Sequence, residues 1–165
     1  MEISPNIFNL LREGRNLHQR NQYSEALTVF NRALEISRNL NDSIGEGLSL
    51  NLIGELYRVQ GQLFLALENY KKALEICRNV SYRSGVGMLL NNIGVVYDNL
   101  GQSHLALNYY RDALEICIEN GNKTEESTLL NNIGVVCYNL GQLQDALHYY
   151  NKALQTKKEI GDRHV

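Results

Sequence analysis

The chain has 165 residues, of which 44% are hydrophobic and 21% are charged, as is typical of a folded globular protein. Lysine and arginine total 16 against 18 aspartate and glutamate residues, and the net charge of −2 argues against nucleic acid or an anionic membrane as partner. No stretch approaches the roughly 18 apolar residues that a membrane-spanning helix requires.

The three cysteines form no short-spaced pair, so we expect neither a disulfide framework nor a zinc site. The histidines show no metal-binding spacing, and the glycines recur periodically instead of gathering in a phosphate-binding loop. We therefore expect no metal and no cofactor. Unpaired cysteines suit a reducing compartment, and the N-terminus does not resemble a secretory signal, so we expect a cytoplasmic location.

The sequence repeats itself at an interval of 40 residues. Residues 90–96 and 130–136 are identical, and shorter matches precede them at the same interval. We divide the single predicted domain (1–165) into four segments, which are residues 5–42, 43–82, 83–122 and 123–162. Four positions keep one class of residue in every segment: glycine (Gly14, Gly54, Gly94, Gly134), alanine (Ala26, Ala66, Ala106, Ala146), an aromatic residue (Phe30, Tyr70, Tyr110, Tyr150) and a second alanine (Ala33, Ala73, Ala113, Ala153).

Each segment predicts two helices joined by a tight turn. In the third segment an apolar stripe at helical spacing marks the first helix, and Gly101 ends it where the chain turns left-handed. Gly94 is small, which lets the two helices of a segment approach closely. At the start of the second segment, Ser43 and Glu46 have the spacing of a capping box. The apolar stripe consists of Leu90, Ile93, Val96, Tyr97 and Leu100.

The first and last segments depart from the pattern. Glu13 stands where the later segments have isoleucine, which suits a first helix that has no preceding neighbour. Thr156 and Lys157 make the end of the last helix more polar, yet no capping helix is evident, so Leu147 and Leu154 should be partly uncovered. We therefore expect the chain either to belong to a longer protein or to stack this uncapped terminal helix against another molecule, including a second copy of itself.

The third segment shows the order of residue classes in full: Gly94, Tyr97, Gly101, Ala106, Tyr110 and Ala113. This order resembles the tetratricopeptide repeat, whose usual unit is about 34 residues. The longer period is similar to that of kinesin light chains, Pins-type polarity adaptors and many bacterial signalling proteins. The resemblance implies an all-α fold, a right-handed α-solenoid of four antiparallel helix pairs (a TPR superhelix). In such a superhelix the first helices line a concave groove.

The groove residues are those on each first helix that face away from the second helix. In the four segments these ladders are Phe8, Arg12, Arg15 and Gln19; Leu48, Leu52, Glu55 and Val59; Met88, Asn92, Val95 and Asn99; and Thr128, Asn132, Val135 and Asn139. The predicted partner-binding residues, taken from these ladders and their flanks, are Arg12, Asn51, Glu55, Arg58, Asn91, Asn92, Val95, Asn99, Asn131, Asn132, Val135 and Asn139.

Asparagine recurs within these helices although it is a poor helix former. Its amide carries a donor and an acceptor, so it can bond both the N–H and the C=O of an extended peptide. In the resembling adaptors, asparagines of this motif contact the peptide backbone, and the matching positions here are Asn92 and Asn132. The alternative is that the asparagines face solvent or bridge neighbouring helices.

The other groove positions would supply selectivity. Arg12, Arg15 and Arg58 predict an acidic element in the ligand near the N-terminal half, and the aliphatic groove residues predict apolar anchors in the middle. The resembling family includes members with a clamp for a terminal carboxylate. Arg12 occupies one row of that clamp, but Leu52 and two asparagines follow it, so we do not expect the clamp here.

The sequence thus predicts a protein that is not an enzyme but an interaction scaffold, with a protein or peptide segment as its partner. An enzyme would need a polar constellation outside the repeat pattern, and the sequence contains no such insertion. Two readings remain open. In the first, the groove binds a separate partner. In the second, the repeats are a structural or regulatory module, with the groove filled in cis or the repeats stacked end to end.

Overall fold

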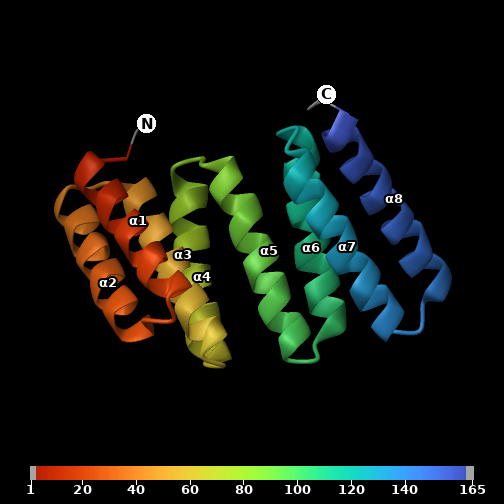
Figure 1. Cartoon of the computed structure of the whole chain (residues 1–165), viewed down its shortest axis with the longest axis horizontal. Coiled ribbons are helices and arrows are strands. Elements are labelled where there is room, and N and C mark those ends of the chain that lie inside the picture. The colour runs from red at the N-terminus through yellow and green to blue at the C-terminus, as the bar shows by residue number, and fades with distance from the viewer. Residues whose placement is uncertain (1–2, 163–165) are drawn as a thin grey trace. The chain divides into compact units, whose positions relative to one another are not determined.

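The computed structural model describes residues 3–162, and this range contains helices and turns but no strand. The predicted all-α fold of consecutive helix pairs is confirmed. The helices, labelled in Figure 1, are α1 (Pro5–Gln19), α2 (Tyr23–Asn39), α3 (Ser43–Val59), α4 (Leu63–Asn79), α5 (Arg83–Asn99), α6 (Ser103–Glu119), α7 (Lys123–Asn139) and α8 (Leu143–Asp162).

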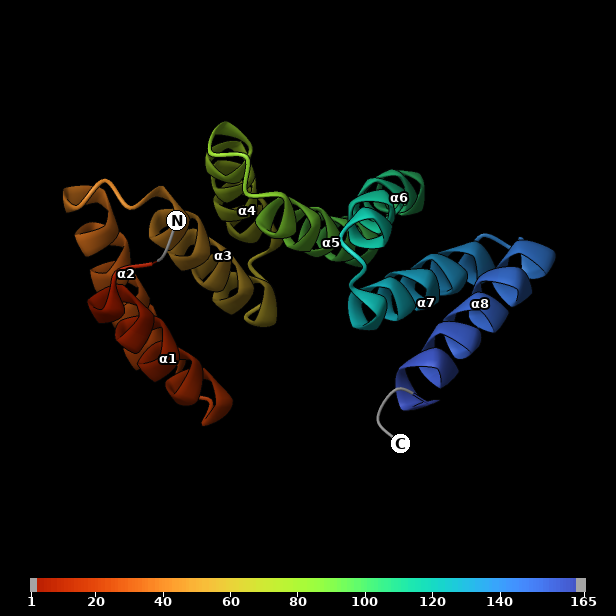
Figure 2. The same cartoon turned by 90° about the horizontal axis from the view of Figure 1, so that it is seen from above.

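The chain forms two compact units, residues 1–89 and 90–165, and the boundary between them falls inside α5. We call them the N-terminal unit and the C-terminal unit and describe each by itself. In the N-terminal unit α1 packs on α2, α2 on α3 and α3 on α4. In the C-terminal unit α6 packs on α7 and α7 on α8, which lie side by side in Figure 2.

A contact between a glycine and an aromatic ring joins the two helices of each pair. A Cβ atom placed on Gly54 would lie 2.7 Å from a ring carbon of Tyr70, and one on Gly94 would lie 2.6 Å from Tyr110. The close approach predicted for Gly94 therefore exists, and it is an aromatic ring that fills the space beside the glycine. The same pairs in the outer repeats are Gly14 with Phe30 and Gly134 with Tyr150.

Left-handed residues close the turns between helices. The turns within the pairs place Asn21, Gly61, Gly101 and Gly141 at φ values of 60° to 75°. In the turn after α3, Gly61 N–H donates to the Arg58 carbonyl (3.0 Å) and Gln62 N–H donates to the Tyr57 carbonyl (2.8 Å). These bonds satisfy carbonyls that the helix end leaves free, so the predicted glycine stop signals are confirmed.

The start of α3 differs from its prediction. Asp42 is the N-cap, and its carboxylate accepts a hydrogen bond from Gly45 N–H at 2.8 Å. Ser43 is already the first helical residue, and Glu46 pairs with Arg38 on α2 at 2.8 Å instead of reaching back to a cap. The predicted capping box of Ser43 and Glu46 is therefore wrong, because a carboxylate one residue earlier satisfies the same amides.

The two terminal helices present opposite kinds of outer surface. On α1, Glu13 and Asn16 are exposed, whereas the equivalent Ile133 and Val136 of α7 are fully buried. On α8 the predicted uncovered leucines are confirmed, since Leu147 is 62% exposed. Its equivalent in α4, Leu67, is buried. The outer side of α1 is thus polar, and the outer side of α8 is apolar.

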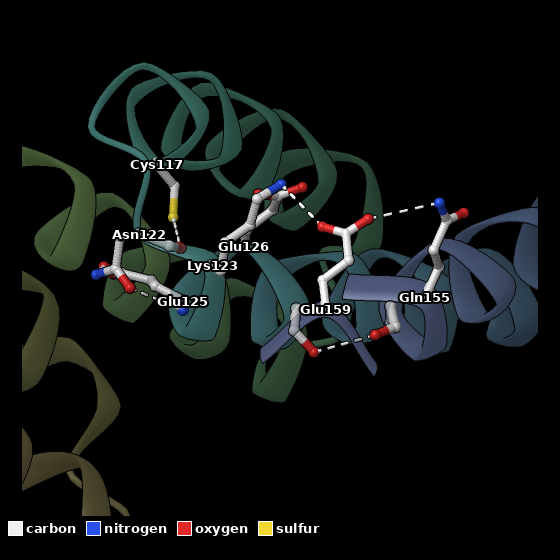
Figure 3. Close-up of polar contacts among 9 residues, drawn as sticks. Cys117, Asn122, Lys123, Glu125, Glu126, Gln155 and Glu159 are labelled. Carbon is white, nitrogen blue, oxygen red and sulfur yellow. Dashed lines mark hydrogen bonds and ion pairs between the residues drawn. The ribbon is translucent and has the colours of Figure 1, made fainter. Parts of the chain in front are cut away.

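Polar contacts tie the end of α8 to the start of α7 (Figure 3). Lys123 Nζ lies 3.0 Å from a carboxylate oxygen of Glu126 and 3.5 Å from one of Glu159. Gln155 Nε2 donates to the other Glu159 oxygen at 3.5 Å. Such exposed pairs contribute little stability, about 0–1 kcal/mol each, so α8 depends mainly on its apolar contacts with α7.

The glycine contact can be tested by adding one methyl group. We expect Gly94→Ala to lower the free energy of unfolding by about 1–3 kcal/mol, because the methyl group would overlap the Tyr110 ring. Gly161→Ala is the matched control, since a Cβ there meets nothing within 4 Å. Urea denaturation of both variants checks the prediction, and equal midpoints for the two would contradict it.

Candidate functional site

The candidate site is the side of each first helix that faces away from its second helix. In the N-terminal unit this surface belongs to α1 and α3, and we call it the N-terminal face. In the C-terminal unit it belongs to α7 and the part of α5 from Leu90 onward, and we call it the C-terminal face. The second helices cover the opposite sides of these helices through the glycine contacts.

On the C-terminal face two asparagines of neighbouring first helices are bonded to each other. Asn132 Nδ2 donates to Asn91 Oδ1 at 3.3 Å, and both residues are half-buried. The bond uses one donor of Asn132 and one acceptor site of Asn91. Within residues 3–162 the Asn91 amide nitrogen and the Asn132 carbonyl oxygen make no hydrogen bond. The pair therefore displays one donor group and one acceptor, the two functions that a peptide backbone presents.

The other candidates on the C-terminal face surround this pair. Asn99, Asn131 and Asn139 are exposed, while Asn92 and Val95 are half-buried; Val135 is exposed. The candidate set omitted Tyr138, which is the most exposed large apolar residue of this face at 61%. Tyr138 stands four residues after Gly134, and this spacing alone predicts that it lies on the outward side of α7.

The N-terminal face contains fewer of the predicted contacts. Asn51 is only 4% exposed, and its Nδ2 donates to the Met88 sulfur at 3.9 Å. It therefore lies against Met88 at the start of α5 and does not face solvent, in line with the alternative that asparagines bridge helices. Leu52, from the ladder of the second segment, is also buried.

Charged residues occupy the exposed part of the N-terminal face. Arg12 and Arg15 on α1 are exposed, and Glu55 and Arg58 on α3 are half-buried. Arg12 donates to Asn9 Oδ1 at 3.4 Å, and Arg58 forms no ion pair within the described residues. Three guanidinium groups thus face one carboxylate, so the face is positively charged.

Beneath this charged surface lies a tyrosine hydroxyl with no hydrogen-bond partner. Tyr70 is fully buried, and among the described side chains its Oη is the buried polar atom without a partner. Burial raises the pKa of Tyr70 to about 12; the nearby Arg58 guanidinium lowers it and the Glu55 carboxylate raises it. The hydroxyl is therefore protonated at neutral pH.

The structure offers no reactive cysteine. Cys77, Cys117 and Cys137 are free and buried. Burial raises the pKa of Cys77 and of Cys117 to about 11, so both thiols are protonated at neutral pH. Among the described residues no group of three or more histidine, cysteine, aspartate or glutamate side chains is arranged to hold a metal ion. No described helix has the length and apolar character needed to cross a membrane.

Comparison with known families decides the nature of the repeat. Residues 45–119 and residues 127–159 each match a family model described as tetratricopeptide repeat, and the two matches together span well over half of the chain. The chain belongs to the tetratricopeptide repeat family. No curated protein sequence matches this tetratricopeptide repeat protein.

Solved structures of similar fold cover most of this tetratricopeptide repeat chain. The apo form of RapI matches with a TM-score of 0.87 and 21% identity over 98% of this chain and 59% of its own. Aspartyl phosphate phosphatase F from Bacillus subtilis matches with a TM-score of 0.89 and 18% identity, over 97% and 43% of the two chains. The Rap conjugation gene regulator of plasmid pLS20, in complex with a Phr peptide, matches with a TM-score of 0.76 and 21% identity, over 91% and 42%.

These likenesses establish the fold and not a shared activity, because all three identities are low. The chain also spans only 42% to 59% of the lengths of these proteins. One of these proteins is named as a phosphatase, and that activity is not assigned to this chain. What the likenesses add is that the helix-pair arrangement is known in proteins longer than this one.

An acidic residue on the C-terminal face should show a dependence on pH. Burial raises the pKa of Asp98 because it disfavours the charged carboxylate. The contribution of the protonated Asp98 to stability is therefore complete at a pH below the unfolded-state pKa. It is lost as the pH rises through the higher folded-state pKa, where the buried carboxyl must ionise. We expect Asp98→Asn to raise the melting temperature at pH 7 and to leave it unchanged near pH 3. Thermal melts across this range check the sign, and a variant less stable at pH 7 would contradict it.

Proposed function

We propose that this tetratricopeptide repeat protein binds an extended segment of another protein along the faces of its first helices. The bonded pair of Asn91 and Asn132 carries the proposal. It leaves an amide donor and a carbonyl acceptor side by side on a half-exposed surface, and such a pair suits the N–H and C=O of one peptide unit. Each bond would contribute only about 0.5–1.5 kcal/mol, so several must act together.

Three further residues support this reading of the C-terminal face. Asn99, Asn131 and Asn139 are exposed asparagines on the same helices, and none of them packs in the core. Amides in these positions would fix the path of a peptide without reading its side chains, and the exposed ring of Tyr138 gives an apolar contact nearby. The fold relative described in complex with a Phr peptide is consistent with a peptide ligand. We propose that the protein acts as a non-enzymatic scaffold in the cytoplasm.

The test compares the bonded pair with an asparagine outside the face. A random peptide library selected on the wild-type chain supplies ligands, whose affinities are then measured for Asn132→Ala and for the control Asn151→Ala on α8. We expect Asn132→Ala to weaken binding about 2- to 10-fold, the range for one or two lost hydrogen bonds, and Asn151→Ala to change nothing.

Backbone methylation of the peptide separates contact from indirect damage. An N-methyl group at the contacted residue should weaken binding to the wild type and have little further effect on Asn132→Ala, because that bond is already lost. Equal effects on both proteins would show that the amide does not contact the backbone. Failure of every library peptide to bind would instead favour a module whose groove is filled in cis.

A second candidate function is self-association through α8. Leu147 and Leu154 are 62% and 53% exposed, whereas the equivalent Leu67 and Leu74 of α4 are 8% and 7% exposed. Head-to-tail stacking on a second copy would place these leucines against the polar outer side of α1, which includes the charged Glu13. Burying that carboxylate is costly, so we propose that two copies pair α8 with α8 about a two-fold axis.

Light scattering with size-exclusion chromatography tests this pairing. We expect the wild-type chain to dimerise as its concentration rises and Leu147→Gln with Leu154→Gln to remain monomeric, because both substitutions remove apolar area that the dimer would bury. The control exchanges Leu105, an exposed leucine on α6, for glutamine. A wild-type monomer at high concentration would contradict the dimer.

A further inference from the structure

The sulfur of Met88 accepts a hydrogen bond from a buried amide. Met88 lies on α5, in the part of that helix that belongs to the N-terminal unit, and it is half-buried. Asn51 of α3 is only 4% exposed, and its Nδ2 donates to the Met88 sulfur at 3.9 Å. A thioether is a weak acceptor, so this long contact contributes little to the stability of the fold.

The repeat does not require a thioether at this position. Leu48 stands 40 residues before Met88 and Thr128 stands 40 residues after it. Leucine has nearly the volume of methionine and would fill the same space without a sulfur atom. What methionine adds is a polarizable sulfur whose lone pairs an oxidant can attack, and a half-buried side chain leaves it within reach of a small oxidant.

The distance between the amide and the sulfur leaves room for an oxygen. An N–H···O bond has a nitrogen–oxygen distance of about 2.9 Å, which is about 1 Å shorter than the 3.9 Å between Asn51 Nδ2 and the Met88 sulfur. An oxygen bonded to the sulfur, and set to one side of the line between the two atoms, therefore reaches hydrogen-bond distance without displacement of either residue. The rotatable bonds of methionine allow the sulfoxide to turn into this orientation.

We propose that Met88 is a site of reversible oxidation to methionine sulfoxide and that the Asn51 amide binds the sulfoxide oxygen. The oxidant is a peroxide. A sulfur lone pair attacks one oxygen of hydrogen peroxide, the S–O bond forms as the O–O bond breaks, and the other oxygen leaves as water with both protons. The sulfur loses two electrons, which the peroxide gains. Two thiols of a sulfoxide reductase reverse the step and yield the thioether, a disulfide and water.

The hydrogen bond to Asn51 changes what oxidation does to the fold. Oxidation of a methionine makes an apolar side chain polar and commonly disrupts the packing around it. Here the new oxygen meets a donor that is already directed at the sulfur, and a sulfoxide is the stronger acceptor of the two. The oxidised chain therefore stays folded and carries a polar group at a position that was apolar. This proposal is independent of the proposed function, because it concerns one side chain and an oxidant.

Dilute hydrogen peroxide applied to the folded protein tests the site. We expect peptide mass mapping to find one added oxygen on Met88, and a methionine sulfoxide reductase with a thiol to remove it. The oxidised and reduced wild type should unfold at nearly the same urea concentration. Met88→Leu keeps Met1 and the three cysteines, so it reports on oxidation elsewhere, and peroxide should leave its midpoint unchanged. Uptake of oxygen by Met88 only after the chain is unfolded would overturn the proposal.

A cycle of oxidation and substitution then tests the contact with Asn51. Asn51→Leu removes the donor, so oxidation should raise its unfolding equilibrium constant about 2- to 10-fold more than that of the wild type, the range for one hydrogen bond. Asn51→Ala is a second variant for the case that leucine does not fit at this buried position. Asn108→Leu changes an exposed asparagine of α6 and should respond to oxidation as the wild type does. An equal effect of oxidation on the wild type and on the Asn51 variants would show that the amide does not bind the sulfoxide.

Discussion

The contact between a glycine and an aromatic ring determines the geometry of every helix pair. The ring lies where a side chain would otherwise project from the first helix, so it fixes which side of that helix is covered. The residues one and four positions after the glycine then face outward, as Glu55 and Arg58 do after Gly54.

The repeat separates positions that hold the fold from positions that can vary. The glycine, alanine and aromatic positions stay nearly the same in the four repeats. The position four residues after the glycine differs in every repeat: His18, Arg58, Asp98 and Tyr138. Because these side chains are half-buried or exposed, their exchange leaves the core untouched. A chain built in this way can change the chemistry of its face repeat by repeat without loss of the helix pairs.

The fold followed from the sequence because its signals are periodic, and the turn glycines and terminal leucines followed for the same reason. The site was only partly predictable. Asn51 and Asn131 occupy equivalent positions, yet the first is buried and contacts Met88 of α5, and the second is exposed. Whether an asparagine at this position is buried depends on the side chains that a neighbouring helix places against it, and the spacing of residues along one helix does not show this. The unbonded hydroxyl of Tyr70 was hidden for a similar reason, because nothing in its spacing distinguishes it from Tyr110.

The leucines of α8 also have a consequence for the length of such arrays. Leu147 and Leu154 are exposed, whereas the leucines at the same positions of α4, Leu67 and Leu74, are buried. A helix pair duplicated by recombination would therefore find a fitting surface on the pair before it and would present the same surface to the next. The interfaces set the spacing of the pairs but place no limit on their number, so gain or loss of 40-residue blocks is an accessible evolutionary step.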